Sequence, residues 1–167
     1  EAIVIDVVPQ TAEMKSKANE LVFLETSVDT SEAYVQGQII YTIKLHYVDI
    51  ITGEIPAEPK IENAIIETIE SEKRYDTYVN NRRYFVFEKR FAIFPQRSGV
   101  LEIPRVTFTG SKVGRGFFSN REPVMAFSET HSVTVKPKPK EFTAPHWLPA
   151  KSVKITEAWS SESKQLT

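Results

Sequence analysis

The chain of 167 residues contains no cysteine. This absence excludes thiol nucleophiles, thiolate metal sites and disulfide bonds. No stretch reaches the roughly 18 consecutive apolar residues that a transmembrane helix requires, and no signal peptide pattern is present. The sequence opens at Glu1 directly in strand-like residues. We therefore expect it to be a piece of a longer protein, so the missing targeting segments say nothing about where that protein is located.

Patterns that would indicate catalysis are also missing. The three histidines, His46, His131 and His146, are far apart, and neither a Gly-x-Ser-x-Gly elbow nor a His-Glu-x-x-His motif occurs. The simplest interpretation is three unrelated surface histidines. The glycine-containing segment Gly110–Arg121 lacks the Lys-Ser/Thr ending of a phosphate-binding loop, so we interpret it as a mobile loop. We expect no enzymatic activity, no metal and no cofactor.

Alternation with a period of two dominates the sequence. Between Gln38 and Tyr47, apolar or aromatic residues alternate with more polar ones, which is typical of a strand with one buried face. Two aromatic-rich runs within Lys73–Phe94 flank the dipeptide Asn80-Asn81. Because asparagine tolerates positive φ, this dipeptide predicts a two-residue type I′ turn that closes a β-hairpin.

Further short strands complete the predicted fold. The segment 56–70 fits either a helical stripe or an irregular strand, and the strand-rich context favours a strand. Frequent turns and few helical patterns predict an all-β, Ig-like β-sandwich, although the Cys…Trp…Cys hallmark of immunoglobulin domains is absent. The additional strands are predicted at Leu21–Val28, Val100–Ile103, Arg105–Thr109 and within Pro123–Val135.

Composition suggests where domains begin and end. The run Lys136–Lys140, Lys-Pro-Lys-Pro-Lys, is typical of a stiff, extended linker. After it, Ser152–Thr156 is similar to the first strand of a following domain. We expect residues 1–17 to end a preceding domain, 18–137 to form the complete sandwich, and 138–167 to comprise the linker and the next strand.

Charge is distributed unevenly along the chain. Residues 1–70 hold 13 acidic and four basic side chains, whereas residues 71–121 hold 11 basic and four acidic ones. This asymmetry indicates either an electrostatic interaction face or acidic and basic strands that pair with each other. Arginine interleaved with aromatics can bind nucleic acid, but the net charge of −1 and the core-like alternation argue against it.

Candidate contact residues follow from exposure and charge. The predicted hairpin tip and the predicted mobile loop would both project from a sandwich, and they carry basic or aromatic side chains. The paired phenylalanines of the loop either cap the core or contact a partner. The candidates are Asn80, Asn81, Arg82, Arg83, Arg115, Phe117 and Phe118.

Several stretches occur in an order and spacing that is similar to one bacterial family. The most specific combination is Phe-Pro-Gln-x-Ser-Gly at Phe94–Gly99 followed by Trp-Leu-Pro-Ala at Trp147–Ala150. Together these stretches resemble the BatD family of bacterial oxygen-tolerance, or aerotolerance, proteins. The other matching stretches are Leu21–Asp29, Tyr34–Leu45, Arg74-Tyr75, Tyr84, Phe91–Ile93, Ile103-Pro104 and Glu157–Ser160.

The resemblance implies a role and a location. Such proteins carry a signal peptide, a multidomain β-sandwich ectodomain in the periplasm and a C-terminal helix that anchors them in the bacterial inner membrane. They accompany von Willebrand A-type membrane proteins, BatA and BatB, and a MoxR-type AAA+ ATPase. The implied role is a non-enzymatic envelope scaffold or chaperone-like partner in the stress response. The family has no accepted catalytic motif, so no site residue is carried over.

A second function stays open from the residues alone. A carbohydrate-binding or adhesin-like envelope sandwich would use aromatic platforms to bind sugar rings. The hairpin offers Tyr75, Tyr78 and Tyr84 for this purpose. Such a platform requires that the three rings are exposed and coplanar.

Overall fold

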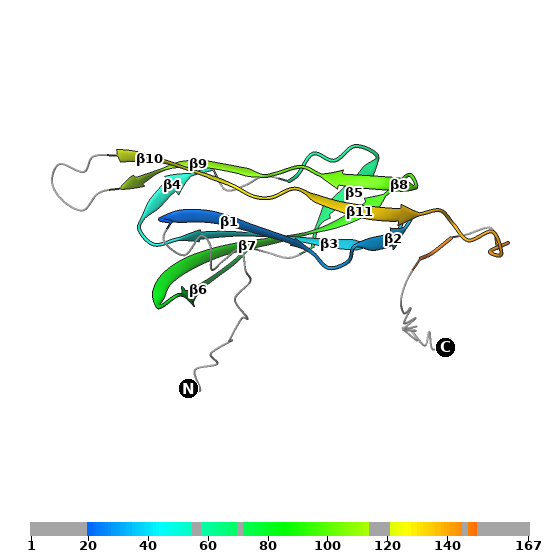
Figure 1. Ribbon diagram of the computed structural model, residues 1–167, viewed down its shortest axis with the longest axis horizontal. Helices are drawn as coiled ribbons and strands as arrows, with labels where there is room; N and C mark the ends of the chain where they lie inside the picture. The colour runs from blue at the N-terminus through cyan, green and yellow to red at the C-terminus, as the bar shows by residue number, and fades with distance from the viewer. Residues whose placement is uncertain (1–19, 55–57, 70–71, 114–120, 145–146, 150–167) are drawn as a thin grey trace, which may run out of the picture.

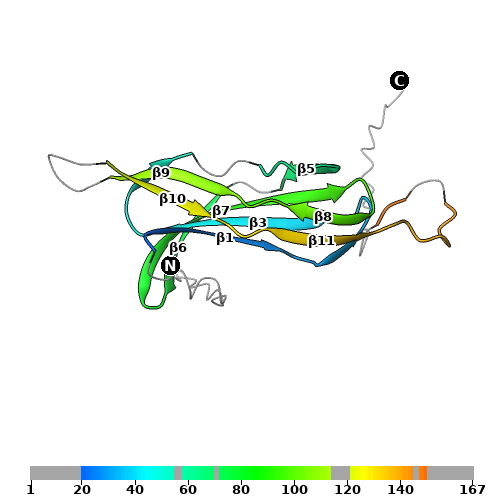
Figure 2. The same ribbon diagram turned by 45° about the horizontal axis from the view of Figure 1, so that its top comes forward.

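All regular structure in the described chain is β-strand, which confirms the all-β prediction. The computed structural model describes residues 20–54, 58–69, 72–113, 121–144 and 147–149. Its strands lie in two facing layers, as Figures 1 and 2 show, and the arrangement is a β-sandwich. No helix of these described segments is both long and apolar enough to cross a lipid bilayer.

One layer is a five-stranded antiparallel sheet built around the long strand β7. Its order is β1-β3-β7, and both β5 and β6 pair with the outer edge of β7. β5 pairs with residues 91–95 and β6 with residues 82–88, so β7 carries two short neighbours end to end. β5 confirms a strand within the ambiguous segment 56–70. The strands are β1 (Val22–Val28), β3 (Ile39–Tyr47), β5 (Ala64–Thr68), β6 (Lys73–Val79) and β7 (Arg82–Pro95).

The other layer consists of two three-stranded sheets, ordered β10-β9-β4 and β2-β11-β8, which follow each other along the sandwich (Figure 1). The two sheets meet at the connection from β8 to β9, which begins at Pro104, and at the connection from β10 to β11, which begins at Ser128. There the backbone N–H of Ser128 donates to the carbonyl of Val106 at 2.9 Å, and the Ser128 hydroxyl accepts from the N–H of Val106 at 2.8 Å. The strands are β2 (Glu32–Tyr34), β4 (Ile51–Gly53), β8 (Gly99–Ile103), β9 (Thr107–Val113), β10 (Arg121–Phe127) and β11 (His131–Lys136).

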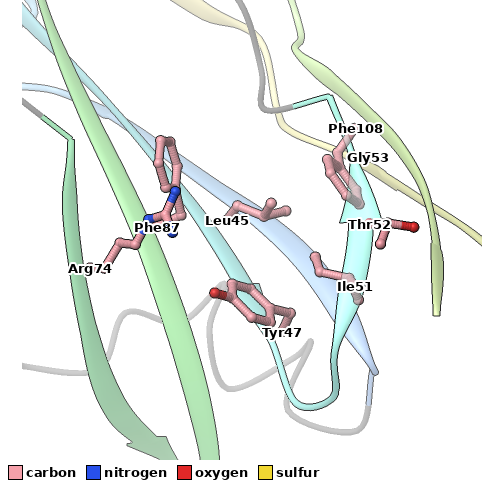
Figure 3. A pocket seen from close by; sticks show the side chains of 8 residues that line it. All are labelled: Leu45, Tyr47, Ile51, Thr52, Gly53, Arg74, Phe87 and Phe108. Carbon is pink, nitrogen blue, oxygen red and sulfur yellow. The ribbon is translucent and has the colours of Figure 1, made fainter. Parts of the chain in front are cut away.

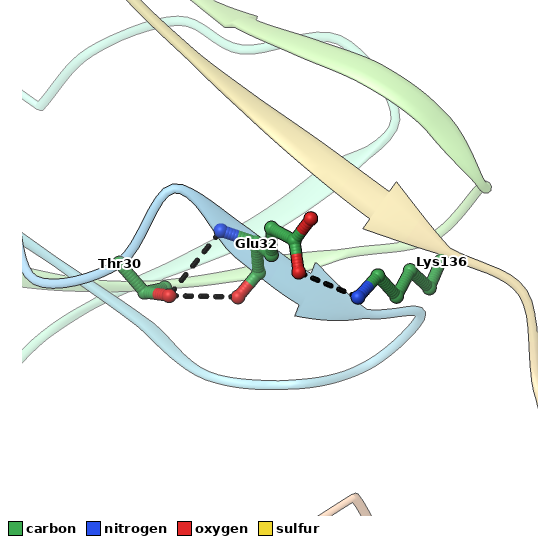
Figure 4. Close-up of polar contacts among 3 residues, drawn as sticks. All are labelled: Thr30, Glu32 and Lys136. Atoms are coloured by element: carbon green, nitrogen blue, oxygen red, sulfur yellow. Dashed lines mark hydrogen bonds and ion pairs between the residues drawn. The ribbon is translucent and has the colours of Figure 1, made fainter.

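The only parallel pair among these described strands joins β2 to β11 and closes one end of the sandwich. Side chains reinforce this pairing (Figure 4). Lys136 forms an exposed ion pair with Glu32, and the Thr30 hydroxyl donates to the carbonyl of Glu32 at 2.7 Å. This ion pair joins one residue of the acidic segment 1–70 to a lysine beyond the basic segment 71–121.

The core confirms the alternation that the sequence shows. Successive side chains of a strand point to opposite faces, and Ile39, Tyr41, Ile43 and Leu45 of β3 all point inward and are buried. β1 and β7 of the same sheet add Leu24, Phe91 and Ile93, and the facing layer contributes further large buried side chains. These are Leu101, Ile103, Phe108, Val133 and Val135.

The loop predicted for Gly110–Arg121 is wrong at both of its ends. Residues 110–113 belong to β9, and Arg121 begins β10, whereas residues 114–120 lie outside the described residues. Gly110 lies opposite Gly53 in the sheet, and a Cβ on Gly110 would lie 2.7 Å from Cζ of Phe108. The glycine therefore marks close packing of an aromatic ring inside a strand and not a turn.

The chain beyond β11 contacts the sandwich. The indole Nε1–H of Trp147 donates to the carbonyl of Val35 at 2.8 Å, and the indole ring meets the rings of Tyr34 and Phe142 edge-on at 5.7 and 4.9 Å. This aromatic cluster holds Trp147 against the loop that follows β2. The division into 1–17, 18–137 and 138–167 stays a prediction, and most of the first and last segments lie outside the described residues.

Candidate functional site

The β6–β7 hairpin turns at the predicted dipeptide. Asn80 and Asn81 have φ values of 47° and 61°, the left-handed conformation that both central residues of a type I′ turn need. Val79 and Arg82 pair directly on either side of the turn. Figures 1 and 2 show that the tip of the hairpin bends away from the second layer. The hairpin therefore has one face turned to the outer side of its own sheet and one face turned toward the open end of the sandwich.

One face of the hairpin covers part of the outer side of the five-stranded sheet. Val79 and Tyr84 pack there against Phe23 in a small buried cluster that is separate from the main core. The Tyr84 hydroxyl donates to the carbonyl of Glu20 at 2.8 Å, and burial raises the pKa of Tyr84 above its ordinary value. This second cluster packs the hairpin against the outer side of β1.

His46 lies within this covered region, so the prediction of a surface histidine is wrong for it. Its side chain is stacked on Phe23 with ring centroids 4.3 Å apart, and the residue is 1% exposed. Nε2 of His46 lies 3.1 Å from Oε2 of the buried Glu25, whereas Nδ1 has no hydrogen-bond partner. His131 is part-buried as well and bonds Thr26 at 2.8 Å. His146 lies outside the described residues.

The opposite face of the hairpin is exposed and combines arginine with aromatic rings. We call it the hairpin surface and define it as Arg74, Asp76, Tyr78, Arg83 and Phe85. The register places these side chains on one face, because Asp76 pairs with Phe85 and Tyr78 pairs with Arg83. Tyr78 is 62% exposed. The Arg83 guanidinium lies over the Phe85 ring at 5.2 Å, and its ion pair with Asp76 raises the pKa of Arg83.

A groove continues from this surface into the open end of the sandwich (Figure 3). Its volume is about 380 Å³, within the range of ligand sites in proteins. Leu45 and Phe87 form its floor, β4 forms one wall, and the Arg74 guanidinium lies 5.6 Å from the centre of the Phe87 ring on the other side. Arg74 is the sole charged residue of the lining. The lining residues are Leu45, Tyr47, Ile51, Thr52, Gly53, Arg74, Phe87 and Phe108.

The structure brings four of the seven candidate contact residues together. Asn80, Asn81 and Arg83 are exposed at the hairpin tip, and the half-buried Arg82 lies over the Tyr84 ring at 5.7 Å. The other three, Arg115, Phe117 and Phe118, lie outside the described residues.

Sequence reasoning missed the groove. Alternation placed Leu45 and Phe87 in the core, and both are indeed buried. Alternation does not indicate where the two layers move apart to leave a groove. That depends on how β4 of one layer is placed relative to β6 of the other. The two glycines of β4 and β9 carry the one available signal, because their missing side chains admit the Phe108 ring that forms part of the wall.

The three tyrosines of the carbohydrate hypothesis do not form a platform. Tyr84 is fully buried, and Tyr75 and Tyr78 lie on opposite faces of β6 because they are an odd number of residues apart. The Tyr75 hydroxyl instead donates to the Glu88 carboxylate at 2.7 Å. The rings therefore cannot stack together on one sugar.

Within the described ranges, no group of three or more histidine or acidic side chains is placed to hold a metal ion. The fold and the site together define an all-β sandwich with a basic and aromatic surface at one end. Comparison of the chain with protein-family models, with curated proteins and with solved structures returned no match.

Proposed function

We propose that this chain is a non-enzymatic protein-interaction module that binds its partner with the hairpin surface. One observation carries the proposal: exposed aromatic and arginine side chains converge on a hairpin that projects from a packed sandwich. Tyrosine and arginine are enriched among the residues that dominate binding energy at protein interfaces. The exposed Tyr78 and the stacked pair of Arg83 and Phe85 supply these residue types.

The partner that we propose comes from the resemblance to the BatD family. It is a von Willebrand A-type membrane protein similar to BatA or BatB, linked indirectly to a MoxR-type ATPase. The parent protein would act at the periplasmic face of the inner membrane through an anchor beyond this sequence. The basic residues of the hairpin favour an acidic patch on that partner, since complementary charge speeds association and selects the correct orientation.

A capture experiment tests this proposal. The chain is immobilised, and the probe is the soluble von Willebrand A-type domain of a BatA-like or BatB-like protein. We expect Tyr78→Ala and Arg83→Ala each to weaken binding about tenfold, the size of a strong interface contact. Both side chains are exposed, so the variants keep the fold.

Matched controls use exposed residues away from the hairpin. Val100→Ala removes an apolar side chain that is 67% exposed on β8, and Arg97→Ala removes an exposed arginine from the turn before it. Both controls should bind like the wild type. Equal capture by the hairpin variants and the controls would refute the role of the hairpin surface, and no capture by the wild type would refute the proposed partner.

A further inference from the structure

The outer edge of β4 has backbone groups available for another strand. No strand of the described residues pairs with this edge, because β4 is the last member of its sheet. The N–H of Val113 donates to the carbonyl of Ile50, and the register then turns the backbone groups of Ile51 and Gly53 away from β9. Figure 3 shows that β4 borders the groove on this side.

The groove below this edge combines apolar walls with one cation. A strand placed beside β4 would run over Leu45, Tyr47 and Phe87. The Arg74 side chain is 68% exposed, and its nearest acidic group, the Glu72 carboxylate, is 3.9 Å away at the limit of an ion pair. Lys112, which lies opposite Ile51 in the sheet, forms a separate ion pair with Asp49 at 3.3 Å. The guanidinium is therefore available to a carboxylate in the groove.

We propose that the groove receives an extended segment of a partner protein, which adds to β4 as a fourth strand and places an acidic side chain against Arg74. The proposal deepens the proposed function and rests on it. Addition of a strand to an open sheet edge provides main-chain hydrogen bonds for affinity and pockets for alternate side chains. Alternate residues of the segment, two apolar and one acidic, would face the groove.

Two synthetic peptides serve as probes. Each is an acetylated, amidated hexapeptide with threonine at the odd positions, and its even positions are Ile, Ile and Glu in one peptide and Glu, Ile and Ile in the other. The two orders cover both strand directions. Matched peptides carry Lys in place of Glu. Binding to the full chain is followed by amide NMR shifts and by titration.

We expect the amides of Ile51 and Gly53 to shift on addition of one Glu peptide. That peptide should bind about tenfold more tightly than its Lys counterpart, as expected for one hydrogen bond between charged groups. Arg74→Glu should reverse the preference, and the control Arg97→Glu should leave it unchanged. Because Arg74 is exposed, its variant should keep the native NMR spectrum elsewhere.

Other outcomes overturn the inference. Absence of binding, shifts confined to other strands, or equal binding of Glu and Lys peptides would each do so. Shifts at Ile51 and Gly53 that follow protein concentration without peptide would assign the groove to a second copy of the chain. The capture experiment on Tyr78 and Arg83 is independent of these readouts, so the groove can fail while the proposed function stands.

Discussion

The buried pair of Glu25 and His46 gives the sharpest energetic prediction. Both residues are more than nine-tenths buried, and their side chains meet at 3.1 Å on the outer side of the five-stranded sheet. Removing one partner of a buried hydrogen-bonded pair leaves the other buried and unsatisfied, whereas replacing both by apolar groups of similar shape is often nearly neutral. A double-mutant cycle separates these two effects.

The cycle uses His46→Phe, Glu25→Leu and the double variant. His46→Phe keeps a ring on Phe23 but leaves the Glu25 carboxylate without this partner, so the free energy of unfolding should fall by about 3 kcal/mol. Glu25→Leu leaves both ring nitrogens of His46 unpaired, because Nδ1 has no partner already, and should lower stability by about 2 kcal/mol. The double variant should lie within about 1 kcal/mol of the wild type.

Urea unfolding followed by circular dichroism measures each free energy. For a chain of this length, the loss of about 3 kcal/mol corresponds to a drop in Tm of about 6–12 °C. These values correspond to a coupling energy of at least about 4 kcal/mol between the two sites. If the double variant loses as much unfolding free energy as the two single variants together, Glu25 and His46 do not stabilise the fold as a pair.

Three further changes test other parts of the fold. Burial raises the pKa of Tyr41; the native state should therefore lose stability as the pH rises above about 10, where the unfolded tyrosine ionises. Tyr41→Phe should remove that part of the pH dependence. At neutral pH the variant should be as stable as the wild type or up to about 1 kcal/mol more stable, because the Tyr41 hydroxyl has no hydrogen-bond partner. A loss of stability above about 1 kcal/mol in urea unfolding would contradict this expectation. Asn81→Gly should keep hairpin stability, whereas Asn81→Val should lower it by about 1–2 kcal/mol because a branched side chain disfavours positive φ; equal urea midpoints for the two variants would count against the turn. Trp147→Phe removes the bond to Val35 and should make tryptic cleavage after Lys140 about fivefold faster; an unchanged rate would show that the indole does not hold this segment.

Much of the fold could be predicted because its signals are local. Alternation from Ile39 to Leu45 identifies a strand with one buried face, and Asn80-Asn81 identifies the hairpin turn. Each of these features depends on residues that are close together in the sequence. The two-layer architecture then follows, because each strand must bury its apolar face against another sheet.

The errors arise where the outcome depends on distant residues. His46 occupies a polar position in the alternation of β3, and its burial depends on Phe23 and on Tyr84 at the far end of the hairpin. Gly110 indicates a loop until its cross-strand partner Gly53 is known. The site shows the same dependence on distant residues. Local sequence predicts the arginine-rich hairpin tip, whereas the groove depends on how far apart β4 and β6 lie.

Hydrogen–deuterium exchange tests the central claim most directly. The full chain is compared alone and in complex with the soluble von Willebrand A-type domain. The proposed interaction module predicts slower exchange in residues 73–85 of the hairpin and in β4, with little change in β8. Slower exchange confined to β8 and β11, or none in the hairpin of a saturated complex, would contradict the claim that this chain binds its partner with the hairpin surface.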